Sequence, residues 1–385
     1  MKLNDLNLKI ILDSRQEETI EVNLNAADGF EAKASIPSGK SKSSKEAFIL
    51  EPKKVAEIFP QLQSALKNKV FTDLYDLANF LNQLDPAKNN FGSNLHLAIE
   101  IAWLRLESLA AAEPLYRLIN HYLNLTELKI PKFLFNLING GAHVKAGLTF
   151  QEYLAIPLKS TAAANLKEAF NLIERISLKY HFNVFGDEGG FAFQSIDPRY
   201  GLEVLSSVLR DETKLGLDLA ANYFCLDQKY TFNNKTMTAV EMTNYYAALL
   251  KDFPIIYMED PLCEDDLLGW QRVCYEFFEK IMVVGDDLTS TKAELIAKFA
   301  ERCLNAVIIK TTQAGGLLET FAAIEAARKN NLKIIISHRS GETMDDFIAD
   351  LTVGAGADFL KAGSPIQKER LAKYERVIAI EKELA

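Results

Sequence analysis

Cysteine is scarce in this chain of 385 residues. The four cysteines, Cys225, Cys263, Cys274 and Cys303, stand far apart and form neither a CxxC pair nor the dense spacing of a disulfide framework. Because disulfides persist mainly in oxidising compartments, this pattern predicts reduced thiols in a cytoplasmic protein. A small secreted scaffold held together by disulfides is therefore excluded.

Long apolar runs are also absent. No stretch reaches the roughly 18 consecutive apolar residues that indicate a membrane-spanning helix. The N-terminal segment MKLNDLNLKIILDSR alternates polar and apolar residues and lacks the uninterrupted apolar stretch of a signal peptide. We expect neither a membrane span nor a secretory leader.

Positive charge is in deficit, because 43 Lys and Arg face 52 Asp and Glu, which gives a net charge of −9. Nucleic acids and anionic membranes bind basic surfaces, so neither is an expected partner.

Low-complexity tracts are absent too. A hydrophobic fraction of 48% with 25% charged residues is ordinary for a folded globular protein.

The patterning of the chain divides it into two domains. Residues 7–36 alternate like strands separated by polar turns, which predicts an antiparallel meander, and residues 53–123 have helical spacing. Together they predict an α+β domain over residues 1–128. Strand and helix then alternate over residues 129–385, which is typical of βα repeats and long enough for a barrel of about 250 residues.

Hydrophobic segments in the second half of the chain each end in one polar residue. Their successive spacings of 41, 27, 24, 28 and 23 residues mostly suit one strand, one helix and two loops. In a closed parallel barrel, all strands open at their C-terminal ends on one face. The sequence therefore predicts that six side chains share one barrel mouth: Asp218, Glu259, Asp286, Lys310, His338 and Lys361.

Three of these side chains are carboxylates, the oxygen ligands that Mg²⁺ prefers. Alternatively, Asp218, Glu259 and Asp286 only form ion pairs with Lys310 and Lys361. Without a cation, however, three converging carboxylates repel one another and raise their own pKa values, which favours the metal site. A metal ion and a second lysine nearby would lower the pKa of Lys310 toward the range of a general base.

Three further loops carry chemistry-bearing residues. GDEGGF presents Glu188 in a glycine-flanked turn, NGGAH carries His143, and SHRSGE groups His338, Arg339 and Ser340. An arginine with a neighbouring hydroxyl is suited to holding a phosphate. Each motif alone is also compatible with an ordinary polar loop.

In combination, these motifs resemble the enolase family, the phosphopyruvate hydratases of glycolysis. The matching stretches run in the family's order over nearly the whole chain. They are ILDSR (11–15), PSG with Ser41, FNLINGGAH (135–143), QEYLAIP (151–157), GDEGGFA (186–192), MEDP (258–261), VGDDLTST (284–291), IIKTTQAGG (308–316), SHRSGET (337–343) and ERLAKYE (369–375).

The resemblance implies an α/β protein in which an N-terminal α+β domain precedes an eight-stranded TIM-type β/α barrel with an antiparallel first hairpin. The N-terminal domain would carry an active-site lid at residues 38–45. The implied activity is that of a lyase that interconverts 2-phosphoglycerate and phosphoenolpyruvate. It would use two Mg²⁺ ions per active site, the second arriving with the substrate.

The resemblance also implies a role for each matching residue. Lys310 would take the C2 proton of the substrate, and Glu188, supported by Glu152, would assist departure of the C3 hydroxide. The catalytic positions are Glu188, Lys310, Glu152 and His338; the substrate-binding positions are His143, Gln151, Arg339, Ser340 and Lys361; and the metal positions are Asp218, Glu259, Asp286 and Ser41.

The lid segment departs from the family pattern. Where the family has PSGASTG, this chain has PSGKSKS, which adds Lys40 and Lys42 and replaces a glycine by Ser43. A lost glycine stiffens a loop that must close over substrate. Two alternatives therefore stand beside the enolase interpretation: a paralogue acting on another phosphorylated or carboxylated acid, and a non-catalytic binding or surface-interaction protein.

Enolases are commonly dimers, and the residues expected to pair across that interface are altered here. Ala379 and Lys382 stand where an arginine and an acid are expected, and Lys382 would face Lys9. Because like charges repel, we expect a homodimer that is weaker than in the family or rearranged. Analytical ultracentrifugation at micromolar concentration measures this, and a tight ordinary dimer would reject the expectation.

Overall fold

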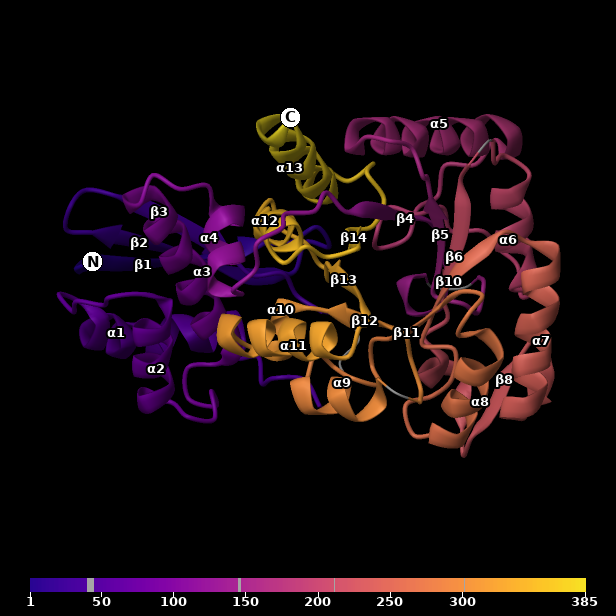
Figure 1. The fold of residues 1–385 in the computed structure, drawn as a ribbon, viewed down its shortest axis with the longest axis horizontal. Coiled ribbons are helices and arrows are strands. Elements are labelled where there is room, and N and C mark those ends of the chain that lie inside the picture. The colour runs from indigo at the N-terminus through magenta and orange to yellow at the C-terminus, as the bar shows by residue number, and fades with distance from the viewer. Residues whose placement is uncertain (40–44, 145–146, 211, 301) are drawn as a thin grey trace.

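The computed structural model describes residues 1–39, 45–144, 147–210, 212–300 and 302–385. Two parts lie side by side in Figure 1, with the N-terminal strands and helices on the left and a barrel of strands and helices on the right. Within the described ranges, no helix has the length and apolar character needed to cross a membrane.

The N-terminal part is a three-stranded antiparallel sheet with helices packed against it, and it confirms the predicted meander. Helix α3 is buried along most of its length and packs on β2 and β3, as its strongly apolar sequence predicts. The strands are β1 (Leu3–Leu12), β2 (Glu18–Ala26) and β3 (Glu31–Ser35). The helices are α1 (Pro52–Leu66), α2 (Leu74–Leu84), α3 (Ser93–Ala110) and α4 (Leu115–Tyr122).

Eight strands close into the predicted barrel, in the order β10-β11-β12-β13-β14-β4-β5-β6. Fully buried apolar side chains, such as Leu134, Tyr257 and Ile335, fill its interior. The strands are β4 (Lys132–Asn139), β5 (Glu152–Ile156), β6 (Lys214–Asp218), β10 (Ile255–Glu259), β11 (Met282–Gly285), β12 (Ala306–Ile309), β13 (Lys333–Ser337) and β14 (Phe359–Lys361). The predicted domain boundary, between residues 128 and 129, lies between α4 and β4.

Strand β5 runs against the other barrel strands. It pairs antiparallel with both β4 and β6, whereas the remaining pairs are parallel. The first residue of β5, Glu152, is therefore in register with the last residues of its neighbours, Asn139 and Asp218. The reversal places a carboxyl from the start of one strand at the rim where the other strands end.

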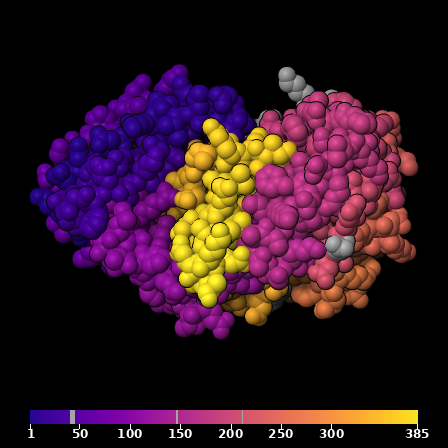
Figure 2. Space-filling view, turned by 90° about the horizontal axis from the view of Figure 1, so that it is seen from above, coloured from indigo at the N-terminus to yellow at the C-terminus, as the bar shows by residue number. Residues whose placement is uncertain are grey.

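Helices cover the outside of the barrel, and the C-terminal segment forms the last of them, α13. Figure 2 shows this helix, in yellow, lying between the N-terminal part and the magenta segment of the barrel. The helices are α5 (Ala162–Tyr180), α6 (Arg199–Ser206), α7 (Ala239–Asp252), α8 (Leu267–Phe277), α9 (Ala293–Phe299), α10 (Thr311–Ala314), α11 (Leu317–Lys329), α12 (Phe347–Gly354) and α13 (Lys368–Leu384), with short 3₁₀ turns η1 (Gly141–His143) and η2 (Ala221–Phe224).

A small antiparallel sheet between η2 and α7 was not predicted. It consists of β7 (Cys225–Leu226), β8 (Lys229–Phe232) and β9 (Lys235–Met237). Strands of two to four residues are too short to show a reliable alternation of polar and apolar residues. The start of α7 is clearer in the sequence, because Thr238 and Glu241 form a capping box there.

Contacts between the two parts hold the loops at the barrel mouth. On α3, Arg105 donates hydrogen bonds of 2.7 and 2.9 Å to Asp345 and one of 3.0 Å to Asp346. The backbones of Ser38 and Gly341 exchange two hydrogen bonds of 2.8 Å each. The N-terminal part therefore positions the loop after β13, which carries the SHRS motif.

Replacing Arg105 by alanine should destabilise the protein by about 2 to 3 kcal/mol, because it leaves the Asp345 carboxylate, whose side chain is only 10% exposed, without its charged partner. Urea denaturation followed by circular dichroism measures the loss. Lys53→Ala is the matched control, since Lys53 forms only an exposed ion pair with Glu18 at 3.6 Å and should cost less than about 1 kcal/mol. Equal losses in the two variants would contradict the prediction.

Candidate active site

A small cavity of about 20 Å³ lies at the mouth of the barrel. Its lining comes from the ends of barrel strands and the loops that follow them, and it includes most of the predicted site residues together with Ser337. The predicted residues that line it are His143, Gln151, Glu152, Glu188, Asp218, Lys310, His338, Arg339, Ser340 and Lys361. The structure thus brings together residues that are up to 218 positions apart in the chain.

The other predicted metal ligands lie beside this cavity or outside the described residues. Glu259 bonds Lys361 and Asp286 bonds Lys310, so both carboxylates contact side chains that line the cavity. Ser41 falls among residues 40–44, which the structure does not describe. The same holds for most of the predicted lid.

Lysines hold the carboxylates at the mouth. The Lys361 Nζ atom lies 2.9 Å from Asp218 Oδ2, 2.7 Å from Glu259 Oε2 and 3.3 Å from Glu152 Oε1. Lys310 Nζ bonds Asp286 in the same way. The ion pairs considered as the alternative to a metal site are therefore present, and two ammonium groups stand next to the acids that were predicted to hold a cation.

The acids at the mouth nevertheless fit a divalent cation. Glu259 Oε1 and Glu152 Oε2 are buried and have no hydrogen-bond partner among the described residues, which leaves carboxylate oxygens available as ligands. Burial, reinforced by Asp218, raises the pKa of Glu259 to about 8. Within the described chain, two groups bring ligand atoms within 4.8 Å of one another: His143, Glu152 and Glu188, and Asp260, Asp286 and Asp287.

The lowered pKa of Lys310 is expected beside a metal ion, and beside the Asp286 carboxylate the pKa shifts in the opposite direction. Burial lowers the pKa of Lys310, but the Asp286 and Glu259 carboxylates together outweigh that effect, and the net pKa lies well above its usual value. The expectation assumed a metal ion as the neighbour of Lys310, whereas here Asp286 bonds it directly. In this state the ammonium group keeps its proton.

Two carboxyls at the mouth are driven to opposite protonation states. Burial raises the pKa of Glu152 well above its usual range, and nearby carboxylates add to this effect. Burial also acts to raise the pKa of Glu188, but the nearby cations Arg370 and Lys361 and the polar N–H groups of the neighbouring imidazoles favour the carboxylate, so the pKa lies well below its usual range. Paired groups whose pKa values are pushed apart are suited to acid and base roles.

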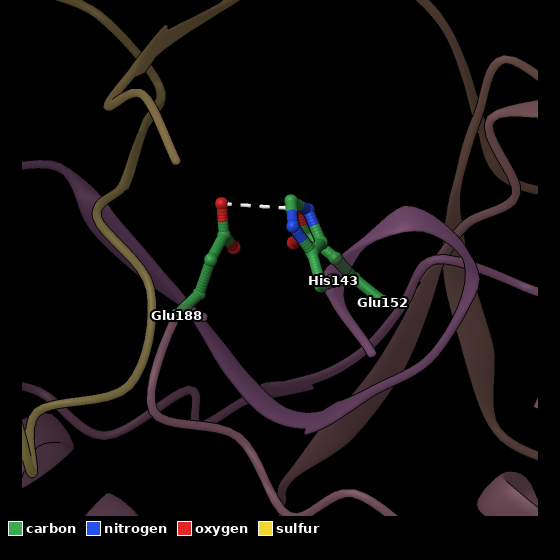
Figure 3. Close-up of side chains that lie close together, drawn as sticks. All are labelled: His143, Glu152 and Glu188. Carbon is green, nitrogen blue, oxygen red and sulfur yellow. Dashed lines mark ion pairs between the residues drawn. The ribbon is translucent and has the colours of Figure 1, made fainter. Parts of the chain in front are cut away.

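His143 stands between these two carboxyls (Figure 3). Its Nε2 atom lies 3.5 Å from Glu188 Oε1 and 3.9 Å from Glu152 Oε1. Burial lowers the pKa of His143, so the neutral imidazole is favoured. The three side chains therefore converge on one point of the cavity.

The GDEGG loop aims Glu188 into the cavity because its glycines pack tightly against β4. A Cβ at Gly186 would lie 2.7 Å from the Asn139 side chain, and one at Gly190 would lie 2.9 Å from Asn139 Oδ1. Asn136, on the same strand, donates a 2.9 Å hydrogen bond to Glu188 Oε2. The loop is thus fixed by the close packing of its backbone against Asn139 and by the hydrogen bond from Asn136 to the Glu188 carboxyl.

The Arg339 and Ser340 pair is anchored to the N-terminal part. Arg339 donates hydrogen bonds of 2.9 and 3.0 Å to Glu46 and one of 3.0 Å to Thr312. Arg15 donates a 3.3 Å hydrogen bond to Ser340. An arginine and a hydroxyl held side by side in this way can bind a phosphate.

Several residues that support the site were not singled out from the sequence. Asn136 carried a usable signal, because it is the polar residue within the apolar strand FLFNLI. Gln313, which donates a 3.0 Å hydrogen bond to Asp286, follows Lys310 in a recognisable motif. Arg370 lies within the matching stretch ERLAKYE. Glu46 had no such signal, since charged residues near a loop are usually solvent-exposed.

Comparisons with known proteins match both parts of the chain. The model of "Enolase, N-terminal domain" matches residues 3–119, and that of "Enolase, C-terminal TIM barrel domain" matches residues 127–385. A protein named Enolase from Ehrlichia ruminantium (strain Gardel) is 34% identical over 99% of this chain and 96% of its own length. Another protein named Enolase, from Anaplasma phagocytophilum (strain HZ), is 36% identical over 100% of this chain and 95% of its own length.

Replacing Lys361 by methionine should make the protein more dependent on a divalent cation. The change leaves three buried carboxylates without their ammonium partner, so the metal-free protein should lose about 3 to 5 kcal/mol of stability. Millimolar Mg²⁺ should then raise the melting temperature of Lys361→Met more than that of the wild type.

Differential scanning fluorimetry with and without Mg²⁺ makes this comparison. Lys333→Met is the matched control, because Lys333 begins β13 at the opposite end of the barrel and is exposed. An equal shift in melting temperature for Lys361→Met and the control would disprove the link between Lys361 and the cation site.

Proposed function

The chain belongs to the enolase family, and we propose that the residues at its barrel mouth catalyse the family's reaction, the reversible dehydration of 2-phosphoglycerate to phosphoenolpyruvate. Family membership makes the protein a lyase, of the hydro-lyase class. The observation that carries the proposal is one cavity containing both Lys310 and the Glu152–Glu188 carboxyl pair. A lysine base and a carboxyl acid are the two groups that such a dehydration requires.

The order of the strands separates the base from the acid. Lys310 follows β12 and Glu152 begins β5, and these two strands are four places apart in the closed ring of eight, so they lie on opposite sides. A substrate between them would meet the base on one face and the carboxyl pair on the other. This suits an elimination in which proton and hydroxide leave from opposite faces.

In the proposed reaction, Lys310 must first lose the proton that its ion pair with Asp286 stabilises. Its neutral Nζ atom then takes the proton from C2 of the substrate, and the carboxyl pair gives a proton to the departing C3 hydroxyl. Glu152 has the raised pKa and holds that proton, while ionised Glu188 and neutral His143 orient it. Arg339 and Ser340 bind the phosphate. The other proposed substrate contacts are Gln151, His338 and Lys361.

The family is metal-dependent, and we propose Mg²⁺ as the cation, with two ions per active site. Asp218, Glu259 and Asp286 would hold the first ion, and Ser41 would contribute to the second, which arrives with the substrate. When bound, the cations supply positive charge that stabilises the dianion formed by removing a proton beside a carboxylate. Hard carboxylate oxygens are the ligands that favour Mg²⁺ over softer metals.

Residues 1–128 would form the domain that supplies the lid at 38–45, and residues 129–385 the catalytic barrel. We further propose that the protein acts in the cytoplasm on a small-molecule substrate and forms a homodimer weaker than is usual in the family. The altered charges at Ala379 and Lys382 support this last point.

Purified protein should produce phosphoenolpyruvate, seen as a rise in ultraviolet absorbance, when 2-phosphoglycerate and Mg²⁺ are added. Lys310→Ala should lower kcat by about 10²- to 10⁴-fold, because the base that takes the proton is gone. Lys333→Ala, at the far end of the barrel, serves as the control and should keep full activity. Correctly folded wild-type protein without turnover would refute the proposed function.

A further inference from the structure

A fully buried arginine on the C-terminal helix reaches into the site. Arg370, near the start of α13, has 0% of its surface exposed. Its guanidinium lies among the loops that carry Glu188 and His338, and within the described part of the chain none of its hydrogen-bond partners is a carboxylate. These partners are Gln367 Oε1 at 2.6 Å, the carbonyl oxygens of Ser340 at 2.9 Å, Arg339 at 3.3 Å and Asp187 at 3.4 Å, and His338 Nδ1.

These five contacts account for all five N–H groups of the guanidinium: one on Nε, two on Nη1 and two on Nη2. A buried charge is costly unless its hydrogen bonds are satisfied. Arg370 is satisfied by neutral acceptors, so it brings its full positive charge into the site. An ion pair with a carboxylate would have cancelled that charge.

The contact with His338 determines where the imidazole carries its proton. Arginine is not deprotonated in proteins and has no acceptor atom, so Arg370 Nη1 can only donate to His338 Nδ1. Nδ1 must therefore be the unprotonated acceptor. A neutral imidazole in this setting carries its hydrogen on Nε2, the atom that lies 3.6 Å from Glu188 Oε2.

We propose that Arg370 is a positioning residue that fixes His338 as its neutral Nε2–H tautomer and directs that N–H toward Glu188 and the substrate. The assignment deepens the proposed function, on which the catalytic consequence rests. The charged groups around His338 are Glu188 from the GDEGG loop, Arg370 from α13, Lys361 from β14 and Lys310 from the loop after β12. Of these, Arg370 is the one that contacts Nδ1.

The chain leaves space for this arginine at Gly363. A Cβ at Gly363 would lie 2.5 Å from Arg370 Cδ and 3.0 Å from Nη1, and the backbone there has a positive φ of 83° that disfavours other residues. Tyr374 donates a 2.8 Å hydrogen bond to the Gly363 carbonyl and so fixes this turn. Helix α13 and the turn after β14 thus together form the space that holds the guanidinium.

Nitrogen-15 NMR of the imidazole rings tests the assignment directly, and it does not require turnover. The chain has only five histidines, and His338→Asn identifies the His338 signals by their loss. Wild-type protein near neutral pH should show His338 protonated on Nε2 and unprotonated on Nδ1. A proton on Nδ1, or a charged imidazole, would overturn the proposal.

Variants separate positioning from a purely structural role. Arg370→Gln should allow both tautomers of His338 and lower kcat by about 10- to 100-fold, the range for losing a group that orients a functional histidine. Arg370→Lys should recover part of kcat. Gly363→Ala, which displaces the guanidinium but keeps its charge, should also disturb the tautomer. Folded Arg370→Gln with the wild-type tautomer would show that Arg370 has only a structural role.

Discussion

The ion pairs of Lys361 are the interaction on which the barrel mouth depends. Its ammonium group binds Asp218, Glu259 and Glu152, which come from three adjacent strands and would otherwise repel one another in a buried site. Lys310 does the same for Asp286. A metal ion that enters must compete with both lysines, so the ion pairs that stabilise the metal-free protein also set its affinity for the cation.

Two features of the fold make these ion pairs possible. The reversed strand β5 places Glu152 at the rim where Asp218 ends its strand, and contacts such as those of Arg105 fix the loops above that rim. The barrel supplies the charges, whereas the N-terminal part and α13 hold the loops that surround them. The strands of the barrel therefore position the acids and lysines, whereas other parts of the chain position the loops around them.

The sequence predicts the barrel and most of its polar residues well, because a βα repeat has a fixed spacing and strand ends share one face. The meander and the polar residues at the strand ends follow from such local patterns, whereas Gln151 and Glu152 were assigned only from the resemblance to the enolase family. Three features do not follow. Spacing alone does not decide whether Asp286 pairs with Lys310 or binds a metal ion, because the two cations compete for the same carboxylate. The role of Arg370 depends on its contact with His338, 32 residues away in the chain. Strands β7–β9 are too short to show periodicity.

The barrel closes through pairing of β14 with β4, its last strand with its first. On the ribosome, Glu152, Asp218 and Glu259 emerge long before Lys361, so the nascent chain carries these acids without their ammonium partner. Arg370 emerges later still. Because chains are made at roughly 5 to 20 residues per second, the half-made barrel has an unbalanced acidic rim for several seconds, and the site is complete only after Lys361 and Arg370 have been synthesised.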